Sequence, residues 1–122
     1  MSSLTESLGQ VMAADGVRAV ALVDIATGMV VRSVGAEDTG FPAAAVGLAE
    51  EAGLARAVLG PGRPGGDLEE ISLVTPGRVH LAKILGPRLG EGMLLFVDLD
   101  RARVNIALAS LRVGQLAPAV LA

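Results

Sequence analysis

The pattern of hydrophobic and polar positions predicts two groups of β-strands along the chain. Residues 17–23 and 29–34 are short runs rich in β-branched side chains, and Asp24 and Gly28 between them suit a tight turn. These two runs therefore predict a β-hairpin. Further along the chain, three more strand-like runs occupy 68–75, 78–85 and 93–99.

Helical spacing of apolar positions predicts a first and a last helix outside the strands. Ser3 to Glu6 fits a capping box ahead of apolar residues three and four positions apart, and this helix is expected to end near Gly16. Asp100 can cap a last helix that runs to about Leu116.

A second helix is predicted between the two groups of strands, over the alanine-rich residues 41–59. Thr39 is available as its N-cap, and Pro42 is tolerated in the first turn. Gly60 and Pro61 stop the helix. The resulting element order is helix, two strands, helix, three strands, helix, which we interpret as one domain over residues 1–122.

The two faces of each strand predict where that strand lies in the sheet, because successive side chains point in opposite directions. The first and fifth strands are apolar on both faces, whereas the second carries Arg32 and the third carries Glu70 and Ser72. With hairpin partners adjacent, the expected order is 2-1-5-4-3, numbered along the chain. We therefore predict an α+β sandwich: a mostly antiparallel five-stranded sheet with helices on both faces.

The second helix carries two apolar stripes rather than one. The first stripe consists of Ala45, Leu48, Ala49, Ala52, Ala55 and Leu59, and Gly47, Leu54 and Val58 form the other, nearly opposite. One stripe can pack on the sheet, so the other is expected to contact a second subunit. The alternative is that the alanines only reflect the high alanine content of the chain and that the second stripe is half exposed to solvent.

Composition excludes several functional classes. Hydrophobic residues make up 52% of the 122-residue chain and charged residues 19%, a balance that favours self-association. A net charge of -3 and only two aromatic residues, Phe41 and Phe96, argue against binding nucleic acid. The absence of cysteine excludes disulfides and cysteine metal sites. No apolar run is long enough to span a bilayer and no signal peptide is recognisable, so a cytoplasmic protein is expected.

The element order and several local features together resemble the roadblock/LC7 domains, in particular bacterial MglB-like regulators. The features are the sequence Gly-Val-Arg-Ala at Gly16 to Ala19, where the first hairpin begins, Asp24 followed by a glycine in the hairpin, and the strand "MLLFVDLD" before the last helix. The resemblance spans nearly the whole chain. The sequence departs from the commoner pattern in its five-residue "DIATG" turn, its proline and glycine loop at 60–66, and a short last helix.

The resemblance implies a homodimer joined through the second helix and third strand into one continuous sheet. It also implies a non-enzymatic role, in which that sheet presents a surface to a small Ras-like GTPase, with no cofactor. In actinobacterial relatives the domain is encoded beside such a GTPase and a sensor kinase. The alanine, glycine and arginine bias of this chain looks like that of such a genome. The predicted dimer contacts are Gly47, Ala52, Leu54, Ala55, Val58, Ile71 and Leu73.

Residues capable of chemistry form no convincing catalytic set. The glycines from Gly60 to Gly66 lack the lysine of a phosphate-binding loop, and His80 has no evident nucleophile. Asp98 and Asp100 are spaced to share a divalent ion, but helix capping by Asp100 explains them more simply. The remaining candidates are the acidic pairs Glu50–Glu51 and Glu69–Glu70, interpreted as solvated, and five arginines considered as a GTPase arginine finger: Arg56, Arg63, Arg88, Arg101 and Arg103.

We therefore predict no catalytic, cofactor-binding or metal-binding residue. The alternative to a GTPase regulator is a small-molecule-sensing or signalling domain built on a similar sheet. The scarcity of polar side chains on the central strands disfavours this alternative, because sensors keep polar groups inside a pocket.

Overall fold

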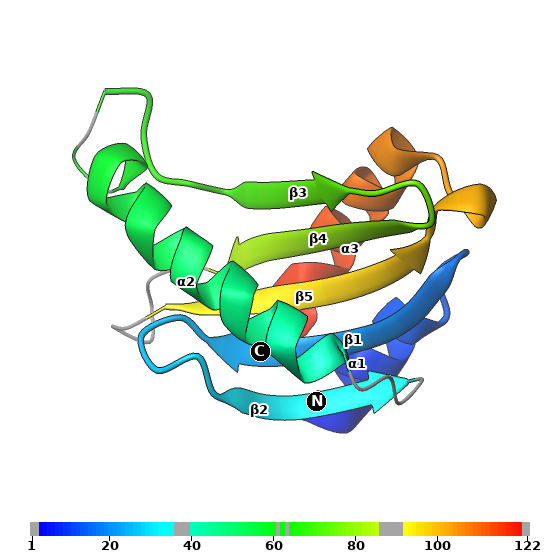
Figure 1. Ribbon diagram of the computed structural model, residues 1–122. Coiled ribbons are helices and arrows are strands. Elements are labelled where there is room, and N and C mark those ends of the chain that lie inside the picture. The colour runs from blue at the N-terminus through cyan, green and yellow to red at the C-terminus, as the bar shows by residue number, and fades with distance from the viewer. Residues whose placement is uncertain (1–2, 36–39, 61, 63, 86–91, 121–122) are drawn as a thin grey trace.

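The strands of the chain form one five-stranded antiparallel sheet with helices on both faces (Figure 1). This computed structural model describes residues 3–35, 40–60, 62, 64–85 and 92–120. The sheet order is β2-β1-β5-β4-β3, which confirms the predicted topology. The elements are α1 (Leu4–Met12), β1 (Val17–Asp24), β2 (Val30–Gly35), α2 (Phe41–Leu59), β3 (Glu70–Val74), β4 (Arg78–Leu85), β5 (Met93–Asp100), the 3-10 turn η2 (Arg101–Arg103) and α3 (Ile106–Val120).

The central position of β1 and β5 explains why both strands are apolar on both faces. Residues 19–23 of β1 and 94–99 of β5 are buried without interruption, and the two strands pair directly. The outer strands β2 and β3 are mostly exposed or half-buried. Strand position is therefore encoded by the burial of both faces, as the sequence pattern predicts.

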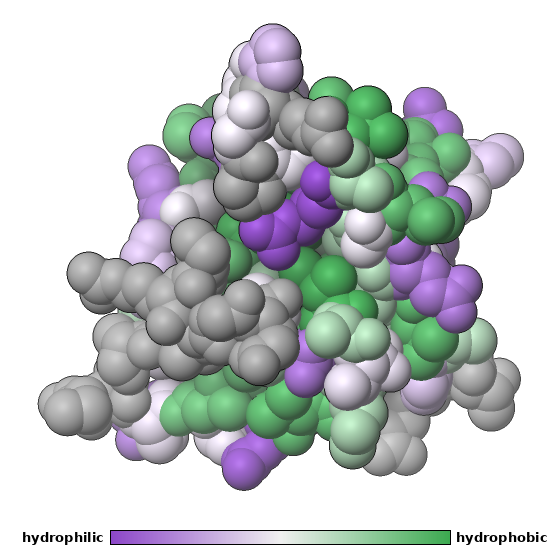
Figure 2. All heavy atoms as spheres, turned by 90° about the vertical axis from the view of Figure 1, so that its left-hand side faces the viewer, coloured by the Kyte–Doolittle hydropathy of each residue, from purple (hydrophilic) through white to green (hydrophobic). Residues whose placement is uncertain are grey.

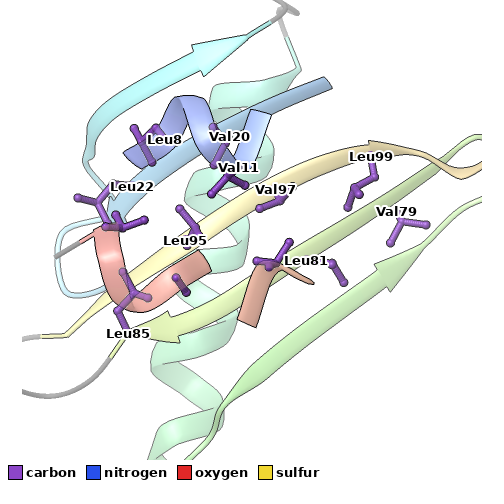
Figure 3. Close-up of a cluster of buried hydrophobic side chains, with 13 residues drawn as sticks. Leu8, Val11, Val20, Leu22, Val79, Leu81, Leu85, Leu95, Val97 and Leu99 are labelled. Atoms are coloured by element: carbon purple, nitrogen blue, oxygen red, sulfur yellow. The ribbon is translucent and has the colours of Figure 1, made fainter. Parts of the chain in front are cut away.

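α1 and α3 cover one face of the sheet. Their cluster contains 13 buried residues, most of them leucine and valine, and Figure 3 shows the labelled side chains converging from α1, β1, β4 and β5. The Ser7 hydroxyl donates a hydrogen bond to the carbonyl oxygen of Ala119 at 3.2 Å. This bond joins the two helices directly, as the first half of α1 meets the end of α3.

α2 crosses the opposite face diagonally and packs on β1, β5 and β2 (Figure 1). Its buried side is formed by Ala45, Leu48, Ala49 and Ala52. The two phenylalanines of the chain stack here, with ring centroids of Phe41 and Phe96 4.9 Å apart. Small side chains on the helix let its backbone approach the sheet closely.

Several helix boundaries differ from the sequence prediction, and α1 ends at Met12 rather than near Gly16. Asp100 caps the short turn η2, its carboxylate accepting from the amide of Ala102 at 3.1 Å, while Asn105 caps α3 by accepting from the amide of Leu108. The last helix therefore starts at Ile106 and continues to Val120. The N-cap of α2 is Gly40, not Thr39, which lies outside the described residues.

The turn of the first hairpin is confirmed. The Asp24 carboxylate accepts from the amide of Ala26 at 3.0 Å, and Gly28 has a φ of +73°. This left-handed conformation favours glycine, which explains its place in the turn. Within the described ranges, no helix has the length and hydropathy needed to cross a membrane.

Candidate protein-interaction surface

The outer side of α2 exposes large apolar side chains. Leu54 is 71% exposed and Val58 is 70% exposed, while the opposite side of the same helix is buried on the sheet. Figure 2 looks at the end of the molecule where α2 finishes and shows hydrophobic surface between hydrophilic groups. Large exposed side chains that lie one turn apart on a helix are typical of a protein contact.

β3 forms one edge of the sheet that α2 covers. It pairs with β4 on one side only, so the backbone groups along its other edge have no strand partner among the described residues. Leu73 is 46% exposed and lies on the α2 face, opposite His80 in the register. An exposed edge with apolar side chains is a template for pairing with another strand.

The seven predicted dimer contacts do not all lie on this surface. Gly47, Leu54 and Val58 are exposed on α2, and Leu73 is exposed on β3. Ala55 and Ile71 are half-buried, whereas Ala52 is fully buried against the sheet. The side chain of Ala52 therefore belongs to the core, because its position on the helix faces the strands.

An ion pair fixes the end of α2 to the segment that leads into β3. The Arg56 guanidinium binds both carboxylate oxygens of Asp67, at 3.2 and 2.9 Å, and Asp67 also accepts from the amide of Leu68 at 2.8 Å. This two-point contact fixes the orientation of the guanidinium relative to the carboxylate as well as the distance between them. Arg56 therefore has a structural role, in which it sets the position of the helix relative to the edge strand.

The α2 face also carries a buried carboxylate, which is the main feature that sequence reasoning missed. Asp98 on β5 is 4% exposed, and its Oδ2 accepts from Arg78 at 3.0 Å and from Arg18 at 3.5 Å. The Nε2 atom of His80 lies 3.2 Å from Oδ1, yet Oδ1 has no hydrogen-bond partner among the described residues. Two arginines thus compensate the buried charge at Oδ2, while among the described residues Oδ1 has the His80 imidazole beside it but no hydrogen bond of good geometry.

A small cavity of about 250 Å³ adjoins this cluster, between the first turn of α2 and strands β4 and β5. Its lining includes Phe41, Ala44, Arg78, His80 and Asp98. The His80 ring meets Phe96 edge to face at a centroid distance of 5.1 Å. The cavity therefore combines an aromatic wall with the incompletely bonded carboxylate.

The other candidates for chemistry are dispersed. Asp98 and Asp100 lie on the same face of β5, but Asp98 binds arginines and Asp100 caps η2. Among the described residues, no cluster of three or more histidine, aspartate and glutamate side chains is placed to hold a metal ion. Glu50, Glu51 and Glu69 are exposed. Arg63 and Arg88 lie outside the described residues, and Arg101 donates to the carbonyl oxygen of Thr75.

Glu70 is the one acidic residue of these pairs that is built into the structure. Burial by itself raises the pKa of Glu70, but hydrogen bonds from Ser110, Lys83 and Ser72, together with the charge of Lys83, lower the pKa below its ordinary value. The Ser110 hydroxyl lies 2.7 Å and the Lys83 amine 3.0 Å from Oε1. This contact joins the edge strand β3 to β4 and α3, and it has no catalytic geometry.

The sheet order and the three helices define the chain as an α+β sandwich of the type helix, hairpin, helix, three strands, helix. Solved structures of the same fold are roadblock/LC7 proteins, so the chain is similar in fold to this class, at low sequence identity. No protein-family model matches the chain, and no curated protein matches it in sequence.

Three solved structures illustrate the similarity. A roadblock/LC7 domain from Streptomyces avermitilis superposes with a TM-score of 0.75 at 17% identity, over 98% of this chain and 95% of that one. MglB in a tetrameric arrangement gives 0.76 at 19% identity, over 96% and 84% of the two chains. The gliding protein MglB from Thermus thermophilus gives 0.71 at 18% identity, over 96% and 87%. The predicted roadblock/LC7 resemblance is thereby confirmed at the level of the fold.

Proposed function

We propose that the protein is a non-enzymatic, homodimeric regulator or scaffold of a small Ras-like GTPase and that it acts in the cytoplasm. One observation carries this proposal: α2 exposes Leu54 and Val58 on the side that does not face the sheet, and β3 leaves one edge of the same sheet without a strand partner among the described residues. A second copy placed on this helix and this edge would cover both. The tetrameric arrangement named for one MglB structure supports self-association.

Leu54→Glu tests the dimer. A charge in the centre of the proposed contact should convert the dimer to a monomer, because an unpaired carboxylate would be buried in an apolar interface. Gln115→Glu is the matched control, since it adds the same charge at an exposed position of α3, on the other face of the sheet. The measurement is light scattering coupled to size exclusion. A monomeric wild-type protein, or a Leu54→Glu variant of unchanged mass, contradicts the dimer.

The proposed partner follows from the roadblock/LC7 resemblance. A continuous sheet across two subunits offers a wide and rigid surface, and a rigid surface binds without a large ordering cost. Because only contacts that differ between two states can shift their populations, we expect the affinity to depend on the nucleotide held by the GTPase. In this scheme the regulator binds one nucleotide state of the GTPase more tightly than the other and contributes no reacting group.

Titration calorimetry tests the partner directly. A Ras-like GTPase from the same genome is loaded with GDP or with a non-hydrolysable GTP analogue, and its nucleotide hydrolysis is measured in parallel. We expect binding in one state to exceed binding in the other, and no hydrolysis by this protein alone. Absence of binding in both states, or turnover by this protein alone, contradicts the proposal.

The cavity beside Asp98 favours a second candidate function, the sensing of a small molecule. A neutral ligand with a hydroxyl or amide donor would satisfy Oδ1 while its apolar part contacts Phe41. A thermal-shift screen of such compounds tests this candidate, with Asp98→Ala as the variant that removes the acceptor and should abolish any stabilisation. Equal shifts in Asp98→Ala and wild-type protein would exclude this site.

A further inference from the structure

A groove lies on the face of the sheet opposite α2, between the end of α1 and the start of α3. Its volume is about 380 Å³. The buried side chains of Leu99 and Val113 line it, together with the half-buried residues Val17, Val104 and Ala109. Most of the side chains that line the groove are therefore apolar, and the sheet separates the groove from the surface proposed for the dimer (Figure 1).

Close packing holds the groove in shape. Gly16 has a φ of +79°, and a Cβ atom at this position would collide with the side chain of Val104. The amide of Asp100 donates to the carbonyl oxygen of Gly16 at 2.9 Å, while Asn105 caps α3 through the amide of Leu108. The two sides of the groove are thus joined by local contacts before any partner binds, which lowers the ordering cost of binding.

The charge along the groove is positive at one side. Arg103 and Arg112 line it, and neither makes an ion pair or hydrogen bond with the described residues, whereas Arg56 and Arg78 are both paired with carboxylates. α3 contains no acidic residue that would neutralise the positive end of its helix dipole. This partial positive charge at the start of α3 adds to the charge of the two arginines. Asp15 is the one acidic side chain among the lining residues. This local excess of positive charge contrasts with the net charge of -3 of the chain.

Large apolar side chains continue from the groove along α3. Leu108, which lines the groove, is 64% exposed, and Leu111, one turn further, is 60% exposed. Leucines at this spacing form a stripe beside Arg112 on the same helix. The groove thus offers an apolar track beside two guanidinium groups that have no partner in the part of the chain that the structure describes.

We propose that this groove docks an acidic peptide segment of another protein, with the carboxylates of that segment on Arg103 and Arg112 and its apolar side chains on Leu108 and the groove floor. Arginine binds carboxylates through two parallel hydrogen bonds, which gives such a contact specificity as well as affinity. An anionic membrane fits less well, because two arginines fall short of the basic clusters that bind lipid surfaces. The inference is independent of the proposed dimer, since the dimer uses the other face of the sheet.

The probe is a fluorescein-labelled synthetic peptide in which leucines alternate with pairs of glutamates. A second peptide carries lysine in place of every glutamate. Anisotropy titrations with the full chain should show binding of the acidic peptide that weakens as salt is raised, because the charges lie at the surface. In amide NMR spectra, the peptide should shift the signals of residues that line the groove.

The variant that tests the site is the double substitution Arg103→Glu with Arg112→Glu. It should weaken binding of the acidic peptide by about tenfold or more, since attraction becomes repulsion. Arg32→Glu with Arg101→Glu is the matched control, because it changes the net charge equally at two exposed arginines outside the groove. We expect the control pair to change affinity by about twofold at most.

Four results would overturn the proposal. They are no binding of the acidic peptide at millimolar concentration, equal binding of the lysine peptide, equal loss in the control pair, and NMR shifts that map to α2 instead of the groove. Vesicles of anionic lipid provide the remaining comparison. Binding to these vesicles without binding to the acidic peptide would assign the surface to a membrane.

Discussion

The two faces of the sheet are built from side chains of different size. Of the 13 buried residues in the cluster under α1 and α3, one is alanine, whereas five of the nine in the cluster under α2 are alanine. Large branched side chains fill the space under two helices on the first face. On the second face, small side chains let one long helix lie close to the strands and leave its outer side exposed.

This difference separates the face that is expected to contribute most of the folding free energy from the face that is proposed to form the dimer. The α1 and α3 face removes more apolar surface from water, so it is expected to contribute most of the free energy of folding. The α2 face keeps Leu54, Val58 and Leu73 exposed, and it holds the charged cluster around Asp98. Substitutions on the two faces should therefore differ in size and in kind.

The largest expected effect is that of Leu95→Ala, in the centre of the α1 and α3 face. Leu95 is fully buried, and its truncation leaves a cavity between β5 and the helices. The free energy of unfolding should fall by about 2–5 kcal/mol. Denaturant titration at one fixed protein concentration measures it, because association would otherwise contribute to stability. A loss below about 1 kcal/mol would contradict the division of roles between the faces.

An enlarged side chain should test whether α2 packs closely on the sheet through its small side chains. Ala49 is 1% exposed beneath α2, so Ala49→Leu forces the helix away from the strands and should cost about 1–3 kcal/mol. Ala57→Leu, at an exposed position of the same helix, is the matched control and should be nearly neutral. Thermal unfolding of both variants checks the expectation. Equal stability of the two variants would mean that α2 does not pack as closely as its alanines indicate.

The smallest expected effect concerns Glu70, the polar contact between β3 and α3. Glu70→Gln should lower stability by about 0.5–1 kcal/mol at neutral pH, because the ion pair with Lys83 is lost. The folded state lowers the pKa of Glu70, so this contribution is present above the ordinary value of 4.5 and is lost as pH falls through the folded value. The wild-type and variant stabilities should therefore converge in acid.

Denaturation midpoints measured across this pH range provide the test of Glu70. Glu69→Gln is the control, since the Glu69 carboxylate is exposed and makes no ion pair or hydrogen bond with the described residues. A difference between wild type and Glu70→Gln that persists unchanged in acid would show that the ionised carboxylate is not its source.

The sequence predicted most of the fold but little of the candidate site. Gly60 after α2 and the capping serine before α1 lie where predicted, because caps and turns depend on a few neighbouring residues. The start of α3 was predicted too early, since Asp100 and Asn105 are both good capping residues. Local pattern alone does not distinguish a 3-10 turn from the helix that follows.

Strand order was determined by the sequence, because burial on one or both faces leaves a direct mark on the residue pattern. The cluster around Asp98 was decided only by the tertiary structure. Its partners Arg18, Arg78 and His80 lie on β1 and β4, and antiparallel pairing with β5 brings them together. The sequence placed Ala52 in one stripe with Ala45 and Leu48, but packing decided that this stripe faces the sheet, because alanine suits both an exposed and a buried helix position.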